Sequence, residues 1–318
     1  MRYFDIVITD SKGTALDRWR SHDENGTVKD GFLRVEINAQ VSVQSQASSN
    51  TSVKIWGVPL KYLSQKYNMN GMKMEVYGGM AKGLPLANEA QRGLLFRGEI
   101  IRTYPMWENT SICINFIAIA YAKTKRIDDK SFIFRWSKGQ KLNDAIKQTF
   151  LDISSIDIRI SDQLVNNFDE IAHFSTIQDF GRYIKQRSKS LLILNNYAGV
   201  DFAFENEKLI FTDNTVQQTK KAKIIDFKDF IGQPTWQHVV NIDVRLVMRG
   251  DLMINDVVNL PDRLNAIYNP EHLGFNQRDL LSFTGDWIIN TIQHVGDSRN
   301  LSGDAWVTML NLTKTSKI

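Results

Sequence analysis

Two stretches of the chain share one order of features, and this internal repeat constrains the fold more than any single residue does. The first stretch reads Gly98-Glu99-Ile100-Ile101-Arg102-Thr103, followed by a short polar loop and the alternating run Ser111–Phe116. The second reads Gly285-Asp286-Trp287-Ile288-Ile289-Asn290-Thr291, followed by a loop and the alternating run Trp306–Leu310. Alternation of apolar and polar residues is the pattern of a β-strand with one buried face. The sequence therefore predicts one β unit used twice.

The clearest strand lies between Leu33 and Val43, where every second residue is apolar. Such a strand buries one face and exposes the other. The exposed face is unusual because, beyond Glu36, its side chains are uncharged amides and hydroxyls. It is either an ordinary solvated sheet face or the wall of a channel through which something slides. The candidate lumen-facing residues are Glu36, Asn38, Gln40, Ser42 and Gln44.

The same alternation returns at Val240–Met248, and we align this run with Leu33–Val43 in the repeat. Other parts of the two β units are less regular. We expect a loop at Asp17–Gly31, a turn at Gly78-Gly79, a long excursion at Met80–Gly93 and an insert at Arg263–Phe283.

Between the two β units the pattern becomes mixed α/β. An amphipathic helix is predicted at Gly139–Leu151, and Ser175-Thr176-Ile177-Gln178 has the spacing of a capping box that opens a second helix. The expected strands of this part are Phe132–Trp136, Ile156–Ile160, Ser190–Leu194 and a hairpin of Val200–Phe204 with Leu209–Thr212. The chain thus divides into predicted domains at residues 1–122, 123–222 and 223–318. The fold class is mainly β, and α+β overall.

Composition is that of an ordinary globular protein, with 42% hydrophobic and 23% charged residues. A length of 318 residues predicts two or three domains. The formal charge of +4 neither demands nor excludes a nucleic-acid partner. The single cysteine, Cys113, lies in an apolar run and is expected to be a buried, inert thiol. No signal segment opens the sequence, and the longest apolar stretch, Ile112–Ala122, is too short to span a bilayer.

Motifs that would carry covalent chemistry are absent from the sequence. It holds neither a phosphate-binding glycine loop nor a nucleophile elbow, and its five histidines are scattered. His294 lies near Asp297 and Arg299 and could be a general base held by a carboxylate; a structural histidine at a strand end is the favoured interpretation. The acidic pairs Asp128-Asp129 and Asp169-Glu170 are expected to be solvated loop charges. We therefore predict no catalytic residue, no cofactor and no metal site.

Several segments together resemble a baseplate hub protein of contractile-tailed bacteriophages. The most specific is the C-terminal run Gly285-Asp286-Trp287-Ile288-Ile289, then His294-Val295-Gly296-Asp297-Ser298-Arg299 and Trp306-Val307-Thr308. Further similar segments are Phe4-Asp5-Ile6-Val7-Ile8, Ser52-Val53-Lys54-Ile55-Trp56-Gly57-Val58 and Phe96-Arg97-Gly98-Glu99-Ile100. They bracket nearly the whole chain.

This resemblance implies two tail-tube-like antiparallel β-barrel domains flanking a smaller α/β domain. It implies a homotrimer whose six barrels adapt a sixfold tail tube to a threefold central spike, with DNA only in transit through the lumen. The uncharged face from Glu36 to Gln46 would then be part of the lumen wall. The expected location is the virion tail baseplate, after synthesis in the host cytoplasm, without stable membrane association. Contacts with the tape measure and other baseplate proteins stay open.

Two other classes of function are considered. A tail-associated peptidoglycan hydrolase would need a catalytic acid or a nucleophile dyad, and a carbohydrate-binding module would need clustered exposed aromatic residues. The sequence also does not separate a phage hub from the equivalent part of a tailocin or another contractile injection device.

Overall fold

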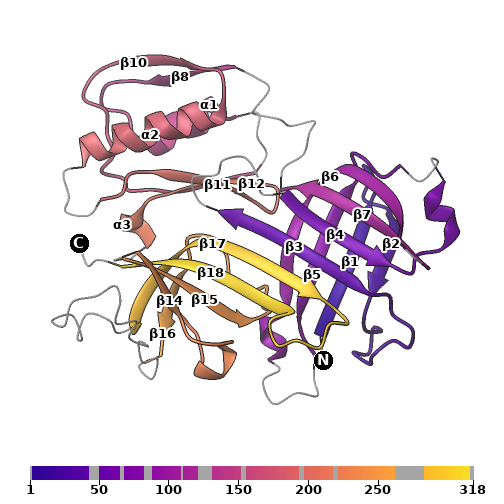
Figure 1. The fold of residues 1–318 in the computed structure, drawn as a ribbon. Coiled ribbons are helices and arrows are strands. Elements are labelled where there is room, and N and C mark those ends of the chain that lie inside the picture. The colour runs from indigo at the N-terminus through magenta and orange to yellow at the C-terminus, as the bar shows by residue number, and fades with distance from the viewer. Residues whose placement is uncertain are drawn as a thin grey trace.

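The structure is a computed structural model, and its layout is shown in Figure 1. It describes residues 2–42, 50–64, 68–81, 88–108, 110–120, 131–151, 155–192, 197–217, 221–238, 240–261 and 283–315. The insert predicted at Arg263–Phe283 lies outside these residues except for Phe283, and residues 82–87 of the Met80–Gly93 excursion do too.

One large antiparallel sheet forms most of the molecule. Its 13 strands run in the order β14-β15-β18-β17-β3-β4-β7-β6-β5-β1-β2, with β16 beside β17 and β13 beside β16. The predicted mainly-β class is confirmed. The strands are β1 (Arg2–Thr9), β2 (Ala15–Arg20), β3 (Val35–Ser42), β4 (Asn50–Trp56), β5 (Lys73–Met80), β6 (Gly93–Glu108), β7 (Ser111–Ile119), β13 (Lys223–Ile224), β14 (Thr235–His238), β15 (Asn241–Val247), β16 (Val257–Leu260), β17 (Gly285–Asp297) and β18 (Trp306–Lys314).

Two expectations for the first β unit are wrong. The loop predicted at Asp17–Gly31 begins inside strand β2, which pairs with β1 and brings Trp19 against Phe116 at a ring-centroid distance of 5.9 Å. The turn predicted at Gly78-Gly79 is instead the end of β5, paired with β1 and in part with β6. No strand signal marks β2 in the sequence, because the strand is short and Trp19 is its one residue that packs against the core.

The repeat is visible as two equivalent hairpins, β6–β7 and β17–β18. Both first strands carry a β-bulge, after Ile100 in β6 and after Ile289 in β17. The backbone around these residues matches as well, because Ile100 exchanges hydrogen bonds with Gly71 and Met72 as Ile289 does with Asn255 and Asp256. These shared irregularities make Ile100 and Ile289 structurally equivalent.

The strand order corrects one part of the predicted repeat. β15 lies beside the closing strand β18, the place that β4 holds beside β7. Strand β14, on the far side of β15, therefore corresponds to β3, and β16 corresponds to β5. The alignment of Leu33–Val43 with Val240–Met248 is wrong by one strand, because alternation alone cannot distinguish neighbouring strands.

The α/β segment stands to one side of the large sheet (Figure 1). It has a two-stranded sheet of β8 and β10 and a three-stranded sheet in the order β11-β12-β9. Its elements are β8 (Phe132–Trp136), α1 (Leu142–Thr149), β9 (Ile156–Arg159), β10 (Glu170–Phe174), α2 (Ile177–Leu191), β11 (Asp201–Glu205), β12 (Lys208–Thr212) and the short α3 (Asn214–Gln217). Short 3-10 turns elsewhere are η1 (Leu60–Leu63), η2 (Glu89–Gln91) and η4 (Phe227–Asp229).

Helix α2 shows where local signals succeed and fail. Its N-cap is Thr176, whose hydroxyl accepts a hydrogen bond from the Asp179 N–H at 3.1 Å, so the capping signal is one residue later than predicted. Ile177, Phe180 and Ile184 are buried as expected. The helix continues to Leu191, so the strand predicted from Ser190 is wrong. The predicted hairpin β11–β12 is confirmed, with Asn206 and Glu207 at positive φ in its turn.

The tip of this hairpin touches both β units. The Glu207 N–H donates to the Ala120 carbonyl at 2.7 Å, and the Asn206 side chain accepts from the Arg97 N–H at 2.9 Å. On the other side, the Glu205 carboxylate accepts from the Ile254 N–H at 3.2 Å. Burial raises the pKa of Glu205 to about 7. The α/β segment is thereby attached where the two β units meet.

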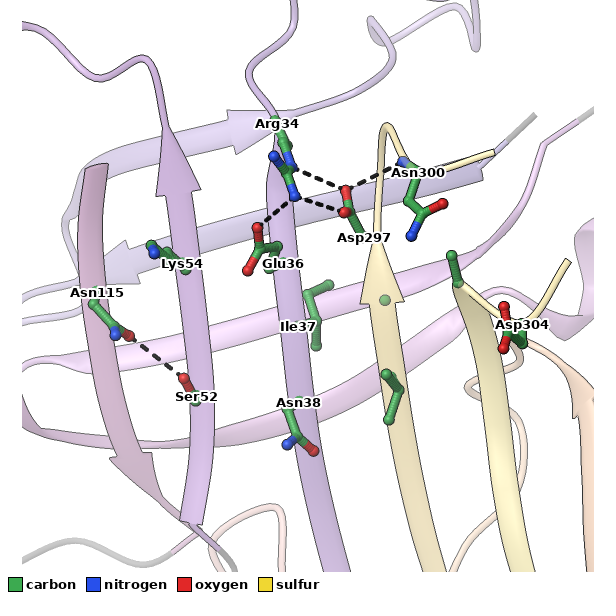
Figure 2. A pocket seen from close by; sticks show the side chains of 13 residues that line it. Arg34, Glu36, Ile37, Asn38, Ser52, Lys54, Asn115, Asp297, Asn300 and Asp304 are labelled. Atoms are coloured by element: carbon green, nitrogen blue, oxygen red, sulfur yellow. Dashed lines mark hydrogen bonds and ion pairs between the residues drawn. The ribbon is translucent and has the colours of Figure 1, made fainter. Parts of the chain in front are cut away.

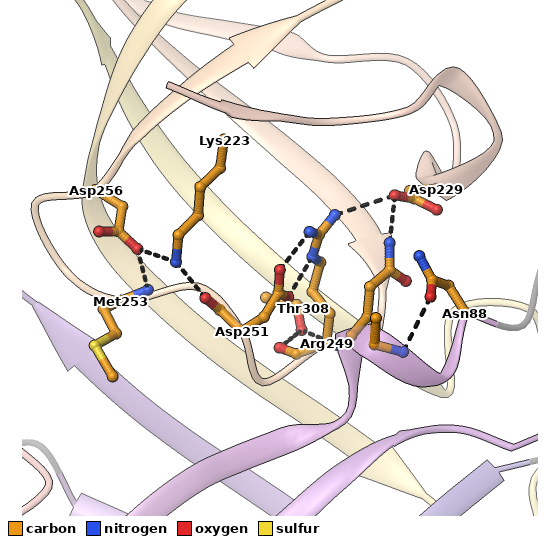
Figure 3. Close-up of polar contacts among 10 residues, drawn as sticks. Asn88, Lys223, Asp229, Arg249, Asp251, Met253, Asp256 and Thr308 are labelled. Carbon is orange, nitrogen blue, oxygen red and sulfur yellow. Dashed lines mark hydrogen bonds and ion pairs between the residues drawn. The ribbon is translucent and has the colours of Figure 1, made fainter. Parts of the chain in front are cut away.

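The two β units themselves meet along a tightly packed seam. A Cβ atom at Gly93 would lie 2.4 Å from the Gly250 carbonyl oxygen, so the two backbones touch there. Beside it, the Trp306 indole N–H donates to the Gly79 carbonyl at 2.9 Å. Buried ionic groups close the seam, as Figure 3 shows: Arg249 pairs with Asp229, which also accepts from the Gln91 amide at 2.7 Å. Backbone contact, a hydrogen bond and buried charge thus hold the two units together along this seam.

Two hydrophobic cores follow from this arrangement. One contains the first β unit together with the α/β segment, and the second lies in the C-terminal β unit around Trp287, Ile289 and Leu312. No helix among the described residues is long and apolar enough to cross a membrane.

Candidate functional site: a polar sheet face

The side chains predicted to face a lumen do share one face of β3. Glu36, Asn38, Gln40 and Ser42 alternate with Val35, Ile37, Ala39 and Val41, which are all buried. The predicted alternation is confirmed. Gln44 lies outside the described residues.

This face continues across eight adjacent strands, in the order β14-β15-β18-β17-β3-β4-β7-β6. We call it the polar face, because uncharged amides and hydroxyls bond to one another or to a neighbouring carboxylate across most of its strand boundaries. The bonds are Gln237 to Asp243 (2.6 Å), Asn311 to Asp243 (2.7 Å), Thr313 to Asn241 (2.9 Å), Gln293 to Asn38 (2.9 Å), Ser52 to Asn115 (3.4 Å) and Asn115 to Tyr104 (2.9 Å). Hydrogen bonds between neighbouring side chains hold this row in fixed positions on the sheet surface.

Among the described residues the polar face carries a hollow at the boundary between the β units and another in the C-terminal β unit. The first, of about 500 Å³, is lined by residues of β3, β4, β7 and β17, among them Glu36, Asn38 and Lys54 (Figure 2). The second, of about 530 Å³, lies over β15, β17 and β18 and includes Arg245 and Gln293. Both are open depressions in a sheet rather than closed ligand cavities.

Charges at one end of the polar face neutralise one another. Arg34 lies 2.8 Å from both Glu36 and Asp297, and Lys54 lies 2.8 Å from Glu108 (Figure 2 shows the Arg34 cluster). The Trp56 indole N–H donates to Glu36 at 2.7 Å, with the Lys54 ammonium 4.0 Å from the ring centre. The cations therefore present little free positive charge.

Asp297 and Arg34 also join β17 to β3 across the boundary between the β units. Burial by itself would raise the pKa of Asp297, but hydrogen bonds from Arg34 and from the backbone N–H of Arg299 hold it below its ordinary value. The hydrogen bond to Asp297 raises the pKa of Arg34 in turn. Both groups are charged at neutral pH.

Two solved structures share this architecture over nearly the whole chain. The 43 kDa tail protein of prophage MuSo2 from Shewanella oneidensis superposes with a TM-score of 0.55 at 10% identity, covering 98% of each chain. The tail protein from Neisseria meningitidis MC58 gives 0.54 at 10% identity, covering 98% of this chain and 96% of its own. The chain has the fold of phage tail proteins. No family model matches the sequence, and no curated protein does.

In this tail-protein fold, Glu170 is not the predicted solvated loop charge, because it lies in β10 and its carboxylate pairs with Arg187 at 3.2 Å; Asp128-Asp129 lies outside the described residues. His294 and Cys113 have structural roles. His294 is 4% exposed inside β17, its Nδ1 lies 2.9 Å from the Thr308 hydroxyl, and burial lowers its pKa to about 4. It is a neutral core residue, not one held by Asp297. Cys113 is buried as predicted, and burial raises the pKa of its thiol. Within the described residues no group of three or more acidic, histidine or cysteine side chains could hold a metal ion.

Sequence reasoning found the β3 part of the polar face and missed most of the rest. Gln293 and Asn311 belong to it because β17 lies beside β3 and β18 beside β17, and Asn115 belongs to it because β4 lies between β3 and β7. Asn241 and Asp243 stand out as polar positions of an alternating run, but that run carries no signal of its neighbours. The missing information is strand order.

Removing the carboxylate of Asp297 should weaken this boundary in a pH-dependent way. We expect Asp297→Asn to lower the free energy of unfolding by about 0.5–1 kcal/mol at neutral pH, a small effect because Arg34 is partly exposed to solvent. Since the folded state lowers the pKa of Asp297, its contribution is present above the unfolded value of 3.8 and is lost as the pH falls through the folded value. Urea unfolding of both proteins at neutral and strongly acidic pH checks this; an equal difference at both pH values would contradict it.

Proposed function

We propose that this protein is a structural baseplate hub of a contractile phage tail, acting as a homotrimer. Each copy contributes two tail-tube-like β-barrel domains, residues 1–122 and 223–318, with the α/β domain 123–222 between them. The trimer adapts the sixfold tail tube to the threefold central spike, and DNA passes through its lumen. Its location is the tail baseplate of the virion. The tail-protein fold supports this proposal.

The observation that carries the proposal is the continuity of the polar face. It takes four strands from each β unit, eight in all, without interruption at the boundary between the units. Three copies would supply 24 strands. At a strand spacing of about 4.8 Å, such a ring has a circumference of about 115 Å and a diameter of about 37 Å between backbones. That leaves room for a DNA duplex.

The chemistry of the polar face suits a passage better than a binding site. Proteins hold DNA mainly by neutralising its phosphates with Lys and Arg, which releases counterions. Here Arg34 and Lys54 are paired with carboxylates, and most of the remaining side chains are uncharged. A phosphate backbone finds few free cations on this surface and is not retained.

The assembly is tested by measuring the mass and symmetry of the purified protein. Native mass spectrometry should give a trimer, and two-dimensional averages in negative stain should show a ring with a central opening. Addition of tail tube protein and of spike protein should each produce a larger complex. A stable monomer that binds neither partner would contradict the proposal.

Adding positive charge to the polar face should make the assembled protein hold DNA. We expect Gln40→Lys combined with Gln293→Lys to bind duplex DNA at low salt at least about tenfold more tightly than the unchanged protein, with affinity falling as salt rises. Gln163→Lys, which adds a charge to an exposed position of the α/β segment, should change binding far less. Fluorescence anisotropy across a salt series measures this. Equal gains for both variants would argue against a lumen role for Gln40 and Gln293.

A further inference from the structure

Strand β6 pairs with different neighbours along its length. Gly93–Glu99 pairs with β5, and Glu99–Glu108 pairs with β7. Its edge near Thr103 is still occupied, since the Thr103 N–H donates to the Asn70 side chain at 2.8 Å. From Tyr104 to Glu108 the strand pairs with β7 alone, as far as the described residues extend. This half is a free sheet edge.

The equivalent half of β17 is not free. With Ile100 matched to Ile289, Tyr104–Glu108 correspond to Gln293–Asp297. Residues Gln293–Asp297 pair with β3. Gln293 lies opposite Gln40, and Asp297 lies opposite Glu36. Among the described residues, no strand of the same chain takes the place beside Tyr104–Glu108 that β3 takes beside β17.

The strand that corresponds to β3 in the C-terminal β unit is β14. Asn38 of β3 lies opposite Ser52 of β4, and Thr235 of β14 lies opposite Asp243 of β15 in the same position of the repeat. β14 pairs with β15, and its other side is unpaired among the described strands. Among the described residues, the two ends of the polar face are therefore both unpaired edges.

We infer that Tyr104–Glu108 of β6 pairs with β14 of a second copy of this chain, repeating between copies the contact that β17 makes with β3 within one. This inference rests on the proposed ring assembly and names its contact. Because Val295 lies opposite Asn38, the repeat fixes the register and places Met106 opposite Thr235 of the second copy. The pairing is head-to-tail, the type of contact that generates a ring.

The side chains at the two edges fit this pairing. Trp107 is 67% exposed, and it points to the face of β6 opposite Met106 and Glu108. On that face of the second copy lie Trp236 of β14 and Pro234, which precedes the strand. A large exposed aromatic residue at a sheet edge gains most by being covered. Pro105 lacks an N–H, so the pairing between copies would have one ladder hydrogen bond fewer at this position. On the other face, Tyr104 and Gln237 would continue the row of polar groups from one copy to the next.

Disulfide trapping tests the register directly. Cys113 lies opposite Met106 within the chain, so Cys113→Ala provides the background. In that background, Met106→Cys with Thr235→Cys should form covalent dimers and trimers on oxidation, seen on non-reducing denaturing gels. Each single variant should stay monomeric on the same gels. So should Met106→Cys with Arg245→Cys, in which the second cysteine lies on β15. A trimer in solution that gives no crosslink from Met106 and Thr235 overturns the pairing and leaves the proposed function standing.

Truncation of the exposed aromatic residue gives a second readout. We expect Trp107→Ser to weaken the trimer by about 30-fold in dissociation constant, as for a buried aromatic anchor of an interface. Its thermal unfolding as a monomer should change little, because the side chain is exposed there. Ile171→Ser, at an equally exposed site of the α/β segment, should leave the trimer intact. Analytical ultracentrifugation decides: an unweakened Trp107→Ser trimer refutes the pairing, and a wild-type monomer refutes the ring itself.

Discussion

Arg249→Met should destabilise the folded chain by about 3–5 kcal/mol at neutral pH, the usual cost of removing one partner from a buried ion pair. Arg249 is 4% exposed and Asp229 is 1% exposed, and the two lie 3.1 Å apart at the seam between the β units. Without Arg249, Asp229 keeps only the Gln91 amide as a side-chain partner. Burial already raises the pKa of Asp229 above its ordinary value, and loss of the cation should raise it further.

The pH dependence separates this mechanism from simple loss of packing. A carboxyl group with a raised pKa in the folded state costs stability when it is ionised, so the loss should shrink as the pH falls toward and below the folded value. A double variant, Arg249→Met with Asp229→Asn, removes both members of this pair and should recover part of the stability at neutral pH. Asp251, which also pairs with Arg249 at 2.7 Å, stays charged in both variants. Chemical unfolding of the two variants at several pH values measures both effects. A loss independent of pH, and not relieved in the double variant, would show that packing alone is responsible.

Gly93→Val should be equally damaging for a different reason. A Cβ atom at this position would lie 2.4 Å from the carbonyl oxygen of Gly250, and neither backbone can move without opening the seam. Overpacking typically costs about 1–3 kcal/mol and more where the neighbour is rigid, so we expect about 3 kcal/mol. A clear fall in the thermal unfolding temperature, measured by calorimetry, is the expected result.

Gly303→Val is the matched control for the seam. Nothing lies within 4 Å of a Cβ atom at Gly303, and its backbone is in an ordinary conformation. The same added side chain should therefore be tolerated there. Equal losses at Gly93 and Gly303 would mean that the close approach of Gly93 to Gly250 does not limit stability.

Local patterns in the sequence predicted local structure well. The alternation in β3, the hairpin β11–β12 and the buried stripe of α2 all follow from periodicity and turn composition, which are read within a few residues. The errors have local causes too. β2 is short and mostly polar outside Trp19, and the end of α2 lacks a glycine or proline that would stop it before Leu191.

The candidate site needed information that no local pattern holds. Asp297 bonds to Arg34 across 263 positions of sequence, and Gln293 bonds to Asn38 across 255. The repeat predicted that two similar hairpins exist, but not that β17 of one lies beside β3 of the other. Alternation fixes which side chains share a face of one strand. Which strands become neighbours depends on the packing of the whole chain, including the contact between Gly93 and Gly250.

The pairing of β3 with β17 also has a consequence for synthesis. The ribosome makes β3 early, and its partner near the end of the chain, so the N-terminal part must wait with one side of β3 uncovered. Open strand edges attract other chains, and nascent proteins emerge slowly compared with local folding. Incomplete chains that lack β17 would therefore tend to aggregate through the uncovered edge of β3, and this edge is covered once β17 has been made.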